Sequence, residues 1–492
     1  MLLKYIPTKL GTYLVRFRSR LNIKYPAIAA LLGQEPEARW METYRNVTGN
    51  DVSLDIDRAI YDANLGFTFK LTGLPSDVDV NAATLPRLLD SWSRIAVSSG
   101  KRLLVFKARQ GWRDFSRIRF KLWGQRALST GRLEIAIVDS DAYLTSRYSI
   151  TPWVQKRDFI ENPSLHAPIK RLSSHSKLQL PLVENTDWHS DPVDVVYTWV
   201  NGADKNWQEE LSKFKRFEDV DQDRFVQNDE LKYSIRSVEL YAPWVRKIFI
   251  FSNCTPPDWF RPSERVQWVT HDEIIEKHIL PVFNSHAIET YLHRMPGLAE
   301  KFLYFNDDFF LTGFVRPSDF FTPYGQSVCR LESYGTLPYF AQLREQGRVE
   351  EWHCAALNSA DLLTEQYGVR PTRLHHHAPY ALQKSVYETL LASFPDQTLL
   401  TRQARFRQPS DFSFTSFFYH HYALMTGKAV ERDEASMVVR PTNFKRFSRH
   451  SLYRTLRFFC LNDGGGSTHS KEYNSFKKKF LARLYQFKSR AE

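Results

Sequence analysis

The run VDVVYTWV, residues 193–200, is a nearly continuous stretch of β-prone apolar residues. Such a run is typical of a central strand in a sheet that is covered on both faces. It ends at NGAD, residues 201–204, which is typical of a turn. Asp194 lies inside the strand, while Asn201 and Asp204 follow its end. These three polar residues are therefore candidates for a binding site on the sheet.

Helices and strands alternate downstream of this run. Asn228 is placed to cap a helix whose first turn holds Asp229 and Glu230, and Pro243 ends that helix. Strands are predicted at residues 247–253, 266–271 and 302–305, and a further helix at residues 285–295. The alternation predicts an α/β fold with a doubly wound, mostly parallel sheet, which binds ligands outside the carboxyl ends of its strands.

Two adjacent carboxylates follow the strand predicted at residues 302–305. Asn306, Asp307 and Asp308 stand between the apolar runs FLYF and FFL. Acids in such surroundings need a compensating partner. One such partner is a divalent cation such as Mg²⁺, held by carboxylates and phosphate oxygens. The alternative is a capping turn with a lysine or arginine partner. We favour the metal site at Asp307 and Asp308 because of the apolar flanks.

Asp194 and Arg236 each have a functional and a structural interpretation. Asp194 can bind a nucleotide or orient a metal ligand, or it can be a buried carboxylate bonded to backbone amides. The sequence leaves that choice even. Arg236 lies one position off the apolar stripe of its helix, where it can clamp a phosphate. A solvated ion pair with Glu239 is the default interpretation for Arg236.

A run of three histidines, residues 375–377, stands in the C-terminal half of the chain. Pro379 suits the first turn of a helix, which would place His377 at the helix N-terminus. Backbone amides there attract phosphate, and a histidine beside them can move a proton. The run can also be a metal trap or an exposed loop.

An arginine cluster follows the histidines. Arg402, Arg405 and Arg407 precede Asp411. Guanidinium groups at this spacing can hold a phosphate through paired hydrogen bonds. An exposed ionic loop is the alternative.

The composition changes along the chain divide it into four parts. Residues 1–160 alternate short strands and helical stretches, which predicts an α/β or α+β accessory module. Residues 161–192 are rich in Pro, Ser and His without periodicity, which indicates a linker. The predicted catalytic domain covers residues 193–465, and residues 466–492 form a basic tail.

The net charge of +12 is concentrated at the two ends of the chain. Residues 1–24 hold six basic residues and no acid, and residues 471–492 hold seven basic and two acidic residues. The nearly neutral middle counts against nucleic acid as a partner. In the tail, aromatic residues recur at helical spacing. Such a helix can lie on an anionic membrane surface or pack its aromatic face on the protein's own core, and we favour the second.

The sequence contains no continuous apolar run long enough to span a membrane, and Lys4, Lys9 and Arg16 interrupt the first residues. The four cysteines lie far apart without a CxxC pair. We therefore expect a cytoplasmic protein, with the tail as the candidate for peripheral contact with the inner membrane face.

Several of these segments together resemble the Stealth family of bacterial capsule and exopolysaccharide phosphotransferases, to which the catalytic subunit of an animal N-acetylglucosamine-1-phosphotransferase is related. The segments are DVVYTWVNGAD (194–204), NDELKYSIRSVELYAPWVRKIFIFSN (228–253), FLYFNDDFFL (302–311) with His377-Ala378-Pro379, Arg407 and Asp411, and CLND (460–463). The resemblance spans about residues 191–465. The first 190 residues and the basic tail lie outside it.

The resemblance implies a glycosyltransferase-A-like, nucleotide-sugar-binding sheet. It implies transfer of a hexose-1-phosphate or N-acetylhexosamine-1-phosphate from a UDP-sugar to a hydroxyl of a growing polysaccharide acceptor. UMP would be released, and Mg²⁺ or Mn²⁺ would be the cofactor. By matching position, the catalytic residues would be Asp194, His377 and Arg407; the substrate-binding residues Asn201, Asp204, Asn228, Arg236, Asn306 and Asp411; and the metal ligands Asp307 and Asp308.

We also expect peripheral contact with an anionic membrane, because of the basic tail, or with the capsule assembly machinery. Two other functions stay open. One is a conventional metal-dependent glycosyltransferase, which would release UDP. The other is a polysaccharide-binding protein without catalytic activity.

Overall fold

The computed structural model describes residues 68–69, 77–162 and 171–173, with gaps at 83–84, 108–110 and 116–132, and residues 191–492, with gaps at 217–226, 314, 450–452, 454–455 and 464–466. The chain forms two compact units, Met1–Thr186 and Asp187–Glu492. The basic segment at residues 1–24 lies outside the described residues.

The first unit contains a mixed sheet with a helix packed on it. Its elements are β1 (Thr68–Phe69), β2 (Asp77–Asn81), α5 (Leu85–Ser98), β3 (Arg102–Lys107), β4 (Gly111–Asp114), β5 (Leu133–Val138), β6 (Leu144–Gln155), β7 (Phe159–Glu161) and β8 (Arg171–Ser173). The strand order is β1-β2-β6-β5-β3-β4, and β7 pairs with β6 and β8. Strand β8 lies within residues 161–192, which were predicted as a linker. Its backbone pairs with β7, so this part of the predicted linker belongs to the sheet.

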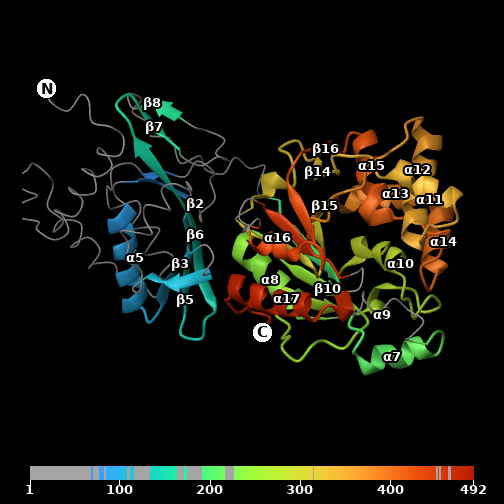
Figure 1. Cartoon of the computed structure of the whole chain (residues 1–492), viewed down its shortest axis with the longest axis horizontal. Coiled ribbons are helices and arrows are strands. Elements are labelled where there is room, and N and C mark those ends of the chain that lie inside the picture. Colours follow the sequence, from blue (N-terminus) through green and yellow to red (C-terminus); the bar gives the residue numbers. More distant parts are fainter. Residues whose placement is uncertain are drawn as a thin grey trace, which may run out of the picture. The chain divides into compact units, whose positions relative to one another are not determined.

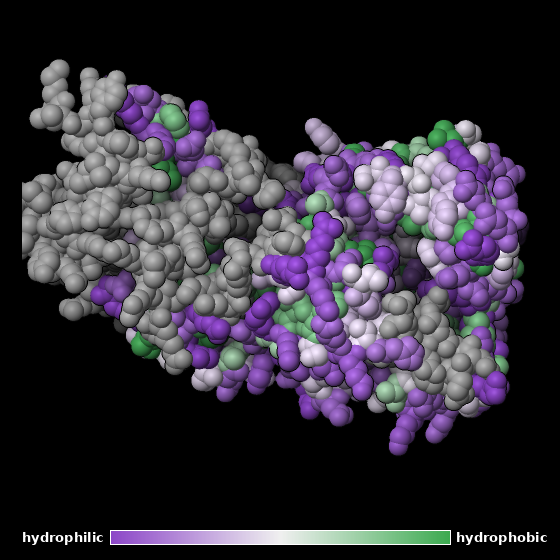
Figure 2. All heavy atoms as spheres, viewed as in Figure 1, coloured by the Kyte–Doolittle hydropathy of each residue, from purple (hydrophilic) through white to green (hydrophobic). Residues whose placement is uncertain are grey.

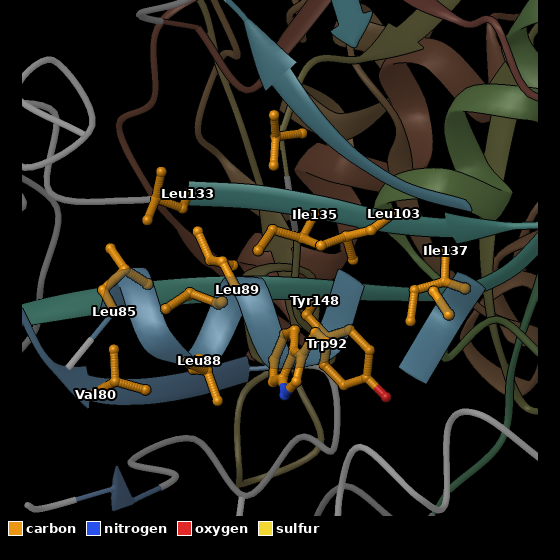
Figure 3. Packing of buried hydrophobic residues seen from close by; sticks show 13 residues of the cluster. Val80, Leu85, Leu88, Leu89, Trp92, Leu103, Leu133, Ile135, Ile137 and Tyr148 are labelled. Atoms are coloured by element: carbon orange, nitrogen blue, oxygen red, sulfur yellow. The ribbon is translucent and has the colours of Figure 1, made fainter. Parts of the chain in front are cut away.

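The core of the first unit lies between α5 and the sheet (Figure 3). Leu85, Leu88, Leu89 and Trp92 lie on one face of α5 because they recur every three to four residues. They meet strand residues that include Leu103, Leu133, Ile135, Ile137 and Tyr148. The ring centroids of Trp92 and Tyr148 are 4.9 Å apart. This unit therefore buries a hydrophobic core of its own.

The second unit is organised around the sheet that the run at residues 193–200 predicts. Its strands are β9 (Val193–Thr198), β10 (Ile248–Phe251), β11 (Val266–Val269), β12 (Lys301–Asn306) and β15 (Tyr380–Gln383), in the order β11-β10-β9-β12-β15. The four strands β9 to β12 are parallel, and β15 runs antiparallel to β12. The prediction of a mostly parallel, doubly wound α/β sheet is confirmed.

Two smaller sheets lie beside the main one. Strands β13 (Phe309–Leu311), β18 (Phe458–Leu461) and β17 (Ser436–Val439) form one, and β14 (Ser327–Cys329) and β16 (Ala429–Glu431) form the other. The tight turn between β12 and β13 carries Asp307 and Asp308. Because β13 pairs antiparallel with β18, this turn lies beside the residues that follow β18.

Helices cover the sheets of the second unit. They are α7 (Lys205–Ser212), α8 (Glu230–Tyr241), α9 (His271–Ile274), α10 (Ser285–Glu289), η5 (Leu292–Arg294), η6 (Pro317–Asp319), α11 (Leu337–Glu345), α12 (Glu351–Tyr367), α13 (Lys384–Ser393), α14 (Pro395–Gln403), η7 (Phe414–Phe418), α15 (Tyr419–Met425), α16 (Phe444–Arg449), η9 (Ser467–His469) and α17 (Lys471–Leu484). In Figure 1, α11 to α15 gather at one end of this unit, and α8 and α17 lie at the other.

The basic tail predicted at residues 466–492 is part of the second unit. Helix α17 buries Tyr473, Phe480 and Leu484. The Phe480 ring packs 5.6 Å from Phe447 of α16 and 5.9 Å from Phe459 of β18, measured between centroids. Of the two interpretations of the tail, the structure therefore shows the one in which the aromatic face packs on the protein's own core.

Two helix predictions are corrected in detail. The helix predicted at residues 285–295 is two short pieces, α10 and η5. Pro379 does not begin a helix: residues 380–383 form β15, and α13 begins only at Lys384. The four residues YALQ continue the main sheet because their backbone pairs with β12. His377 therefore lies before a strand and not at a helix N-terminus.

Within the described residues, no helix is long and apolar enough to cross a bilayer. On the face shown in Figure 2, hydrophilic side chains cover most of the second unit, and its hydrophobic side chains are scattered. All four cysteines are free and buried.

Candidate functional site

The candidate site begins where two central strands end together. The parallel register pairs Thr198, the last residue of β9, with Asn306, the last residue of β12. The hydroxyl groups of Thr198 and Tyr304 are 2.7 Å apart and join the two strands. The turn that follows β12 places Asp307 and Asp308 at this carboxyl end, which is where sheets of this kind bind ligands.

Four carboxylates gather at the turn, and we call Glu230, Asp307, Asp308 and Asp463 the acidic cluster. Glu230 opens α8, and Asp463 follows β18. The Nζ atom of Lys477 lies 2.8 Å from Glu230 Oε1 and 2.5 Å from Asp463 Oδ1. The lysine thus contacts Glu230 and Asp463, and not the two aspartates for which a lysine or arginine partner was the alternative to a metal.

The acidic cluster holds more negative charge than its surroundings compensate. Burial, and then the neighbouring Asp308 and Glu230, raise the pKa of Asp307 well above its ordinary value. Burial raises the pKa of Asp308 to about 6, although the Cys460 thiol opposes this. Burial also raises the pKa of Asp463 to about 7, against the effect of Lys477.

These carboxylates fit a hard divalent cation. Asp308 Oδ1 is buried and has no hydrogen-bond partner among the described residues. Its other oxygen accepts the Cys460 thiol, at 3.0 Å. Carboxylate oxygens are the ligands that Mg²⁺ and Mn²⁺ prefer. A cation here would satisfy the free oxygen and relieve the repulsion that raises both aspartate pKa values.

Gln227 ties the cluster to the loop that follows β9. Its Nε2 donates to Asp307 Oδ2 at 3.1 Å and to the Val200 carbonyl at 2.8 Å. Its Oε1 accepts from the Trp199 indole at 3.0 Å. Because every polar atom of this amide is used, Gln227 fixes the orientation of Asp307.

His377 reaches the site through the antiparallel strand β15. The register pairs Tyr380 with Tyr304, so the residues just before β15 lie beside the turn after β12. The His377 ring is 6.1 Å from that of Phe309, which follows the two aspartates. Burial, and then Arg440, lower the pKa of His377 to about 4. Its imidazole is therefore neutral at pH 7 and free of a proton on one nitrogen.

Arg407 lies against the short helix α10. Its Nη2 and Nε donate to Ser285 Oγ at 2.5 and 3.1 Å. Glu289, one turn further along α10, accepts from the Tyr304 hydroxyl at 3.2 Å. Burial raises the pKa of Glu289 to about 7, although the charge of Arg407 opposes this. Glu289 thus lies between Arg407 and the central strand.

Asp411 organises the segment that carries Arg407. Its Oδ2 accepts from Asn284 Nδ2 at 2.9 Å and from the Gln408 amide at 3.0 Å, and it lies 3.3 Å from His286 Nδ1. Arg402 and Arg405 bind elsewhere, at Thr290 and at the Pro281 carbonyl. The three arginines predicted as one phosphate-binding cluster therefore have three separate partners.

The structure does not bring Asp194 and Arg236 into this site. Asp194 lies near the amino end of β9, where it binds the Arg246 guanidinium and the backbone amides of Lys247 and Ala299. Its second interpretation, a buried carboxylate bonded to amides, matches these contacts. Arg236 binds the Glu492 carboxylate in bidentate fashion and not Glu239. Neither contact involves the acidic cluster.

Four of the substrate-binding candidates lie near the carboxyl ends of the strands: Asn201, Asp204, Asn228 and Asn306. The side chains of the first three form hydrogen bonds to other parts of the protein. Asn201 accepts from the Ala203 amide, and Asp204 caps α7. Asn228 does not cap α8, whose N-cap residue is Asp229; its side chain donates to Asn474 of α17. Asn306 is the candidate that directly precedes the acidic cluster.

A second group of residues could hold a metal ion. The ligand atoms of Cys329, His375 and His420 lie within 4.8 Å of one another, and all three side chains are buried. However, His375 Nε2 accepts from the Arg330 amide at 3.2 Å, and Nδ1 donates to the His376 carbonyl at 2.7 Å. A metal there would have to displace one of these bonds.

Sequence reasoning missed several residues at the site. They are Gln227, Glu230, Glu289, Arg440, Asp463 and Lys477. In the sequence, Glu230 is one of two acids in the first turn of a predicted helix, and Asp463 is the last residue of the CLND segment. For Glu230 and Asp463, the signal that could have found them is a charged residue inside a resembling segment, next to apolar positions. For Lys477, the signal is its position on the apolar stripe of the tail, four residues after Tyr473 and three before Phe480.

Comparison with known proteins places the chain in a family. It matches the models of Stealth protein conserved region 1 at residues 191–216, conserved region 2 at 224–329 and conserved region 3 at 376–424. It is 34% identical over 410 residues to the capsular polysaccharide phosphotransferase SacB of Neisseria meningitidis serogroup A, covering 77% of this chain and 72% of that protein. The chain belongs to the Stealth family.

Other Stealth relatives are exopolysaccharide phosphotransferases. One from Streptomyces coelicolor is 37% identical over 302 residues, covering 59% of this chain and 55% of that protein. CpsY of Mycobacterium tuberculosis is 36% identical over 283 residues, covering 55% of this chain and 52% of that protein. Among solved structures, the galactosyltransferase LgtC in complex with donor and acceptor sugar analogues aligns at a TM-score of 0.30 and 11% identity, covering 60% of this chain and 95% of that one. That similarity is too weak to argue from.

Proposed function

We propose that this Stealth protein is a metal-dependent transferase that moves a hexose-1-phosphate or N-acetylhexosamine-1-phosphate from a nucleotide-sugar donor to a hydroxyl of a growing polysaccharide. The observation that carries the proposal is the undercompensated acidic cluster at the carboxyl end of β12, with His377 beside it. The names of the relatives, capsular and exopolysaccharide phosphotransferases, support this reaction class.

In this proposal, the acidic cluster binds the diphosphate of the donor through a divalent cation. Mg²⁺ or Mn²⁺ held by Asp307 and Asp308 would neutralise charge on the diphosphate oxygens. Gln227 keeps Asp307 in position for this role. Arg440, exposed next to His377, and Arg407, held by Ser285, are the cations assigned to the remaining phosphate oxygens.

The transfer breaks the bond between the bridging oxygen and the sugar-bearing phosphorus. The acceptor hydroxyl oxygen attacks this phosphorus, and its proton passes to the neutral His377 imidazole. The electron pair of the broken bond leaves on the nucleoside monophosphate. The anomeric bond of the sugar stays intact, so the product is a phosphodiester. Asp194 and Arg236, predicted as catalytic and substrate-binding residues, are now assigned to holding the fold.

The released nucleotide tests the reaction. Purified protein is incubated with a panel of nucleotide sugars, an oligosaccharide acceptor and Mg²⁺, and the products are identified by chromatography and phosphorus NMR. We expect stoichiometric UMP from a UDP-sugar and a phosphodiester resonance in the polymer. UDP with a phosphorus-free product would instead identify a conventional glycosyltransferase.

Matched variants test the assigned residues in the same assay. Asp307→Asn removes a proposed metal ligand, and we expect turnover to fall at least about a hundredfold, because the cation stabilises transition-state charge. Asp396→Asn removes an exposed acid at the start of α14, a helix that lies at the opposite end of the unit from α8 and α17 (Figure 1), and we expect no change. Full turnover by Asp307→Asn in excess chelator would contradict the metal assignment.

Two expectations about location stay predictions. We expect the reaction at the cytoplasmic face of the inner membrane, and cell fractionation tests this. The exposed lysines of α17, such as Lys478 and Lys479, remain available for an anionic surface even though the aromatic face is buried.

A further inference from the structure

Lys477 is the most deeply buried basic residue of α17. Its side chain has no exposed surface, although Lys478 and Lys479 directly after it are exposed. An unpaired lysine is almost never buried in this way, because removing the ammonium group from water is costly. Here two carboxylates compensate it: Glu230 Oε1 at 2.8 Å and Asp463 Oδ1 at 2.5 Å.

The rest of α17 holds Lys477 in this position. Tyr473, one turn earlier, donates its hydroxyl to the Val439 carbonyl at 2.8 Å. Phe480, nearly one turn later, packs on Phe447 and Phe459. The ammonium group is therefore delivered to the acidic cluster by a helix whose own side chains are fixed on both sides of it.

The contacts of Lys477 divide the acidic cluster into two pairs. Glu230 and Asp463 each bind the ammonium group, whereas Asp307 binds Gln227 and Asp308 binds Cys460. With all four carboxylates ionised, as they would be around a bound cation, the single lysine leaves three negative charges in excess. Within the part of the chain that the structure describes, Asp307 and Asp308 are the two carboxylates of the cluster without a cationic partner in direct contact, and they are the pair assigned to the divalent cation.

We propose that Lys477 is a built-in counter-ion that reserves Asp307 and Asp308 for a single divalent cation by occupying Glu230 and Asp463. This inference rests on the proposed function, because it takes the metal site as given. Lys477 is a positioning residue: it contacts neither the substrate nor the cation. It also makes the C-terminal helix α17 part of the active site.

Mn²⁺ binding to the full-length protein tests the proposal. Bound Mn²⁺ is counted by electron paramagnetic resonance and its affinity is measured by calorimetry. We expect one site in the wild type. Lys477→Met removes the repulsion between the ammonium group and the cation and frees two carboxylates, so we expect Mn²⁺ to bind at least about tenfold more tightly. Ordinary structural damage would weaken binding, so tightening is diagnostic.

Two controls separate charge from other effects. Lys478→Met removes an exposed lysine from the next position, and we expect unchanged affinity. The double variant Glu230→Gln/Lys477→Met keeps the net charge of the cluster, because it removes one carboxylate together with the ammonium group that the carboxylate contacts. We expect this double variant to fold and to bind Mn²⁺ within about threefold of the wild type.

The outcomes distinguish this inference from the proposed function. If folded Lys477→Met binds Mn²⁺ no more tightly than the wild type, the role of Lys477 is overturned and the metal site stands. If Lys477→Met does not fold, the double variant decides, and its failure to fold or to bind like the wild type overturns the proposal. Absence of Mn²⁺ binding by the wild type would overturn the metal site itself, and this inference with it.

Discussion

Glu289 is a buried carboxylate whose ionisation should lower the stability of the fold. It is almost fully buried beside the Tyr304 hydroxyl, and Arg407 is its cationic neighbour. The charge of Arg407 and the Tyr304 and Thr415 hydroxyls lower the pKa of this group, but burial outweighs them. Ionising such a group inside the protein costs free energy that the unfolded chain does not spend.

The pH dependence of stability should reveal this cost. Burial raises the Glu289 pKa from 4.5 to about 7. Between these two values the folded state binds more protons than the unfolded state, so this group favours folding increasingly as the pH falls from 7 toward 4.5. We expect Glu289→Gln to increase the free energy of unfolding by about 1–3 kcal/mol at pH 8 and to change it little at pH 5.

Urea unfolding at the two pH values measures the difference, and turnover should fall because Arg407 loses its anionic neighbour. Glu388→Gln, an exposed glutamate on α13, is the control. Equal effects of Glu289→Gln at pH 5 and pH 8 would contradict the raised pKa.

At this scale the sequence predicted only part of the site. Asp307 and Asp308 stand out in the sequence because adjacent acids between apolar runs are unusual, and their role stays a prediction. His377 also stands out, but the helix expected after it is strand β15. Glu230, Asp463 and Lys477 come from distant positions, and only the packing of α8, β18 and α17 brings them together.

Among the elements, α17 shows what periodicity can and cannot predict. The spacing of its aromatic residues predicted a helix with one apolar face. The surface that receives this face is assembled from α16 and β18, which are separate in sequence. Patterns within one segment do not encode that surface, so the choice between the core and a membrane stayed open until the fold was known.

The docking of α17 can be tested through Phe480. Its ring is 2% exposed and lies 5.1 Å from the Tyr453 ring, in addition to its contacts with Phe447 and Phe459. Truncating a large buried aromatic leaves a cavity, so we expect Phe480→Ala to lower the free energy of unfolding by about 3–5 kcal/mol. Denaturant unfolding measures this loss.

Lys479→Met, at the neighbouring exposed position, should leave stability within about 0.5 kcal/mol of the wild type. A Phe480→Ala protein as stable as Lys479→Met would mean that α17 does not contribute to the core. If α17 also binds a membrane, Lys479→Met should weaken vesicle binding, whereas the loss of the Phe480 ring should not.

For the whole molecule, the sequence predicted the main sheet well because its strands are nearly continuous apolar runs. The strand pairing at residues 193–198, 248–251 and 301–306 follows from that pattern and from the alternation with helices. The first unit was harder to predict, because short strands such as β7 and β8 carry no periodicity of their own. Their place in the sheet depends on the pairing partner.

The separate cores of the two units lead to a prediction about the whole chain. Trp92 is fully buried in the core of the first unit, against Tyr148. The acidic cluster belongs to the second unit. Residues that share one hydrophobic core unfold together, whereas units with separate cores can unfold separately. We therefore expect calorimetry of the full chain to show two transitions. Trp92→Ala should lower only one of them, by several degrees, because it opens a cavity in the first core.

Mn²⁺ should raise only the other transition. A ligand that binds the folded state of one unit stabilises that unit by mass action and leaves an independent neighbour unchanged. In Asp307→Asn this Mn²⁺ effect should disappear, while the transition sensitive to Trp92→Ala stays in place. A single transition that responds to both Trp92→Ala and Mn²⁺ would show that the two units unfold together, and the first unit would then contribute to the stability of the site.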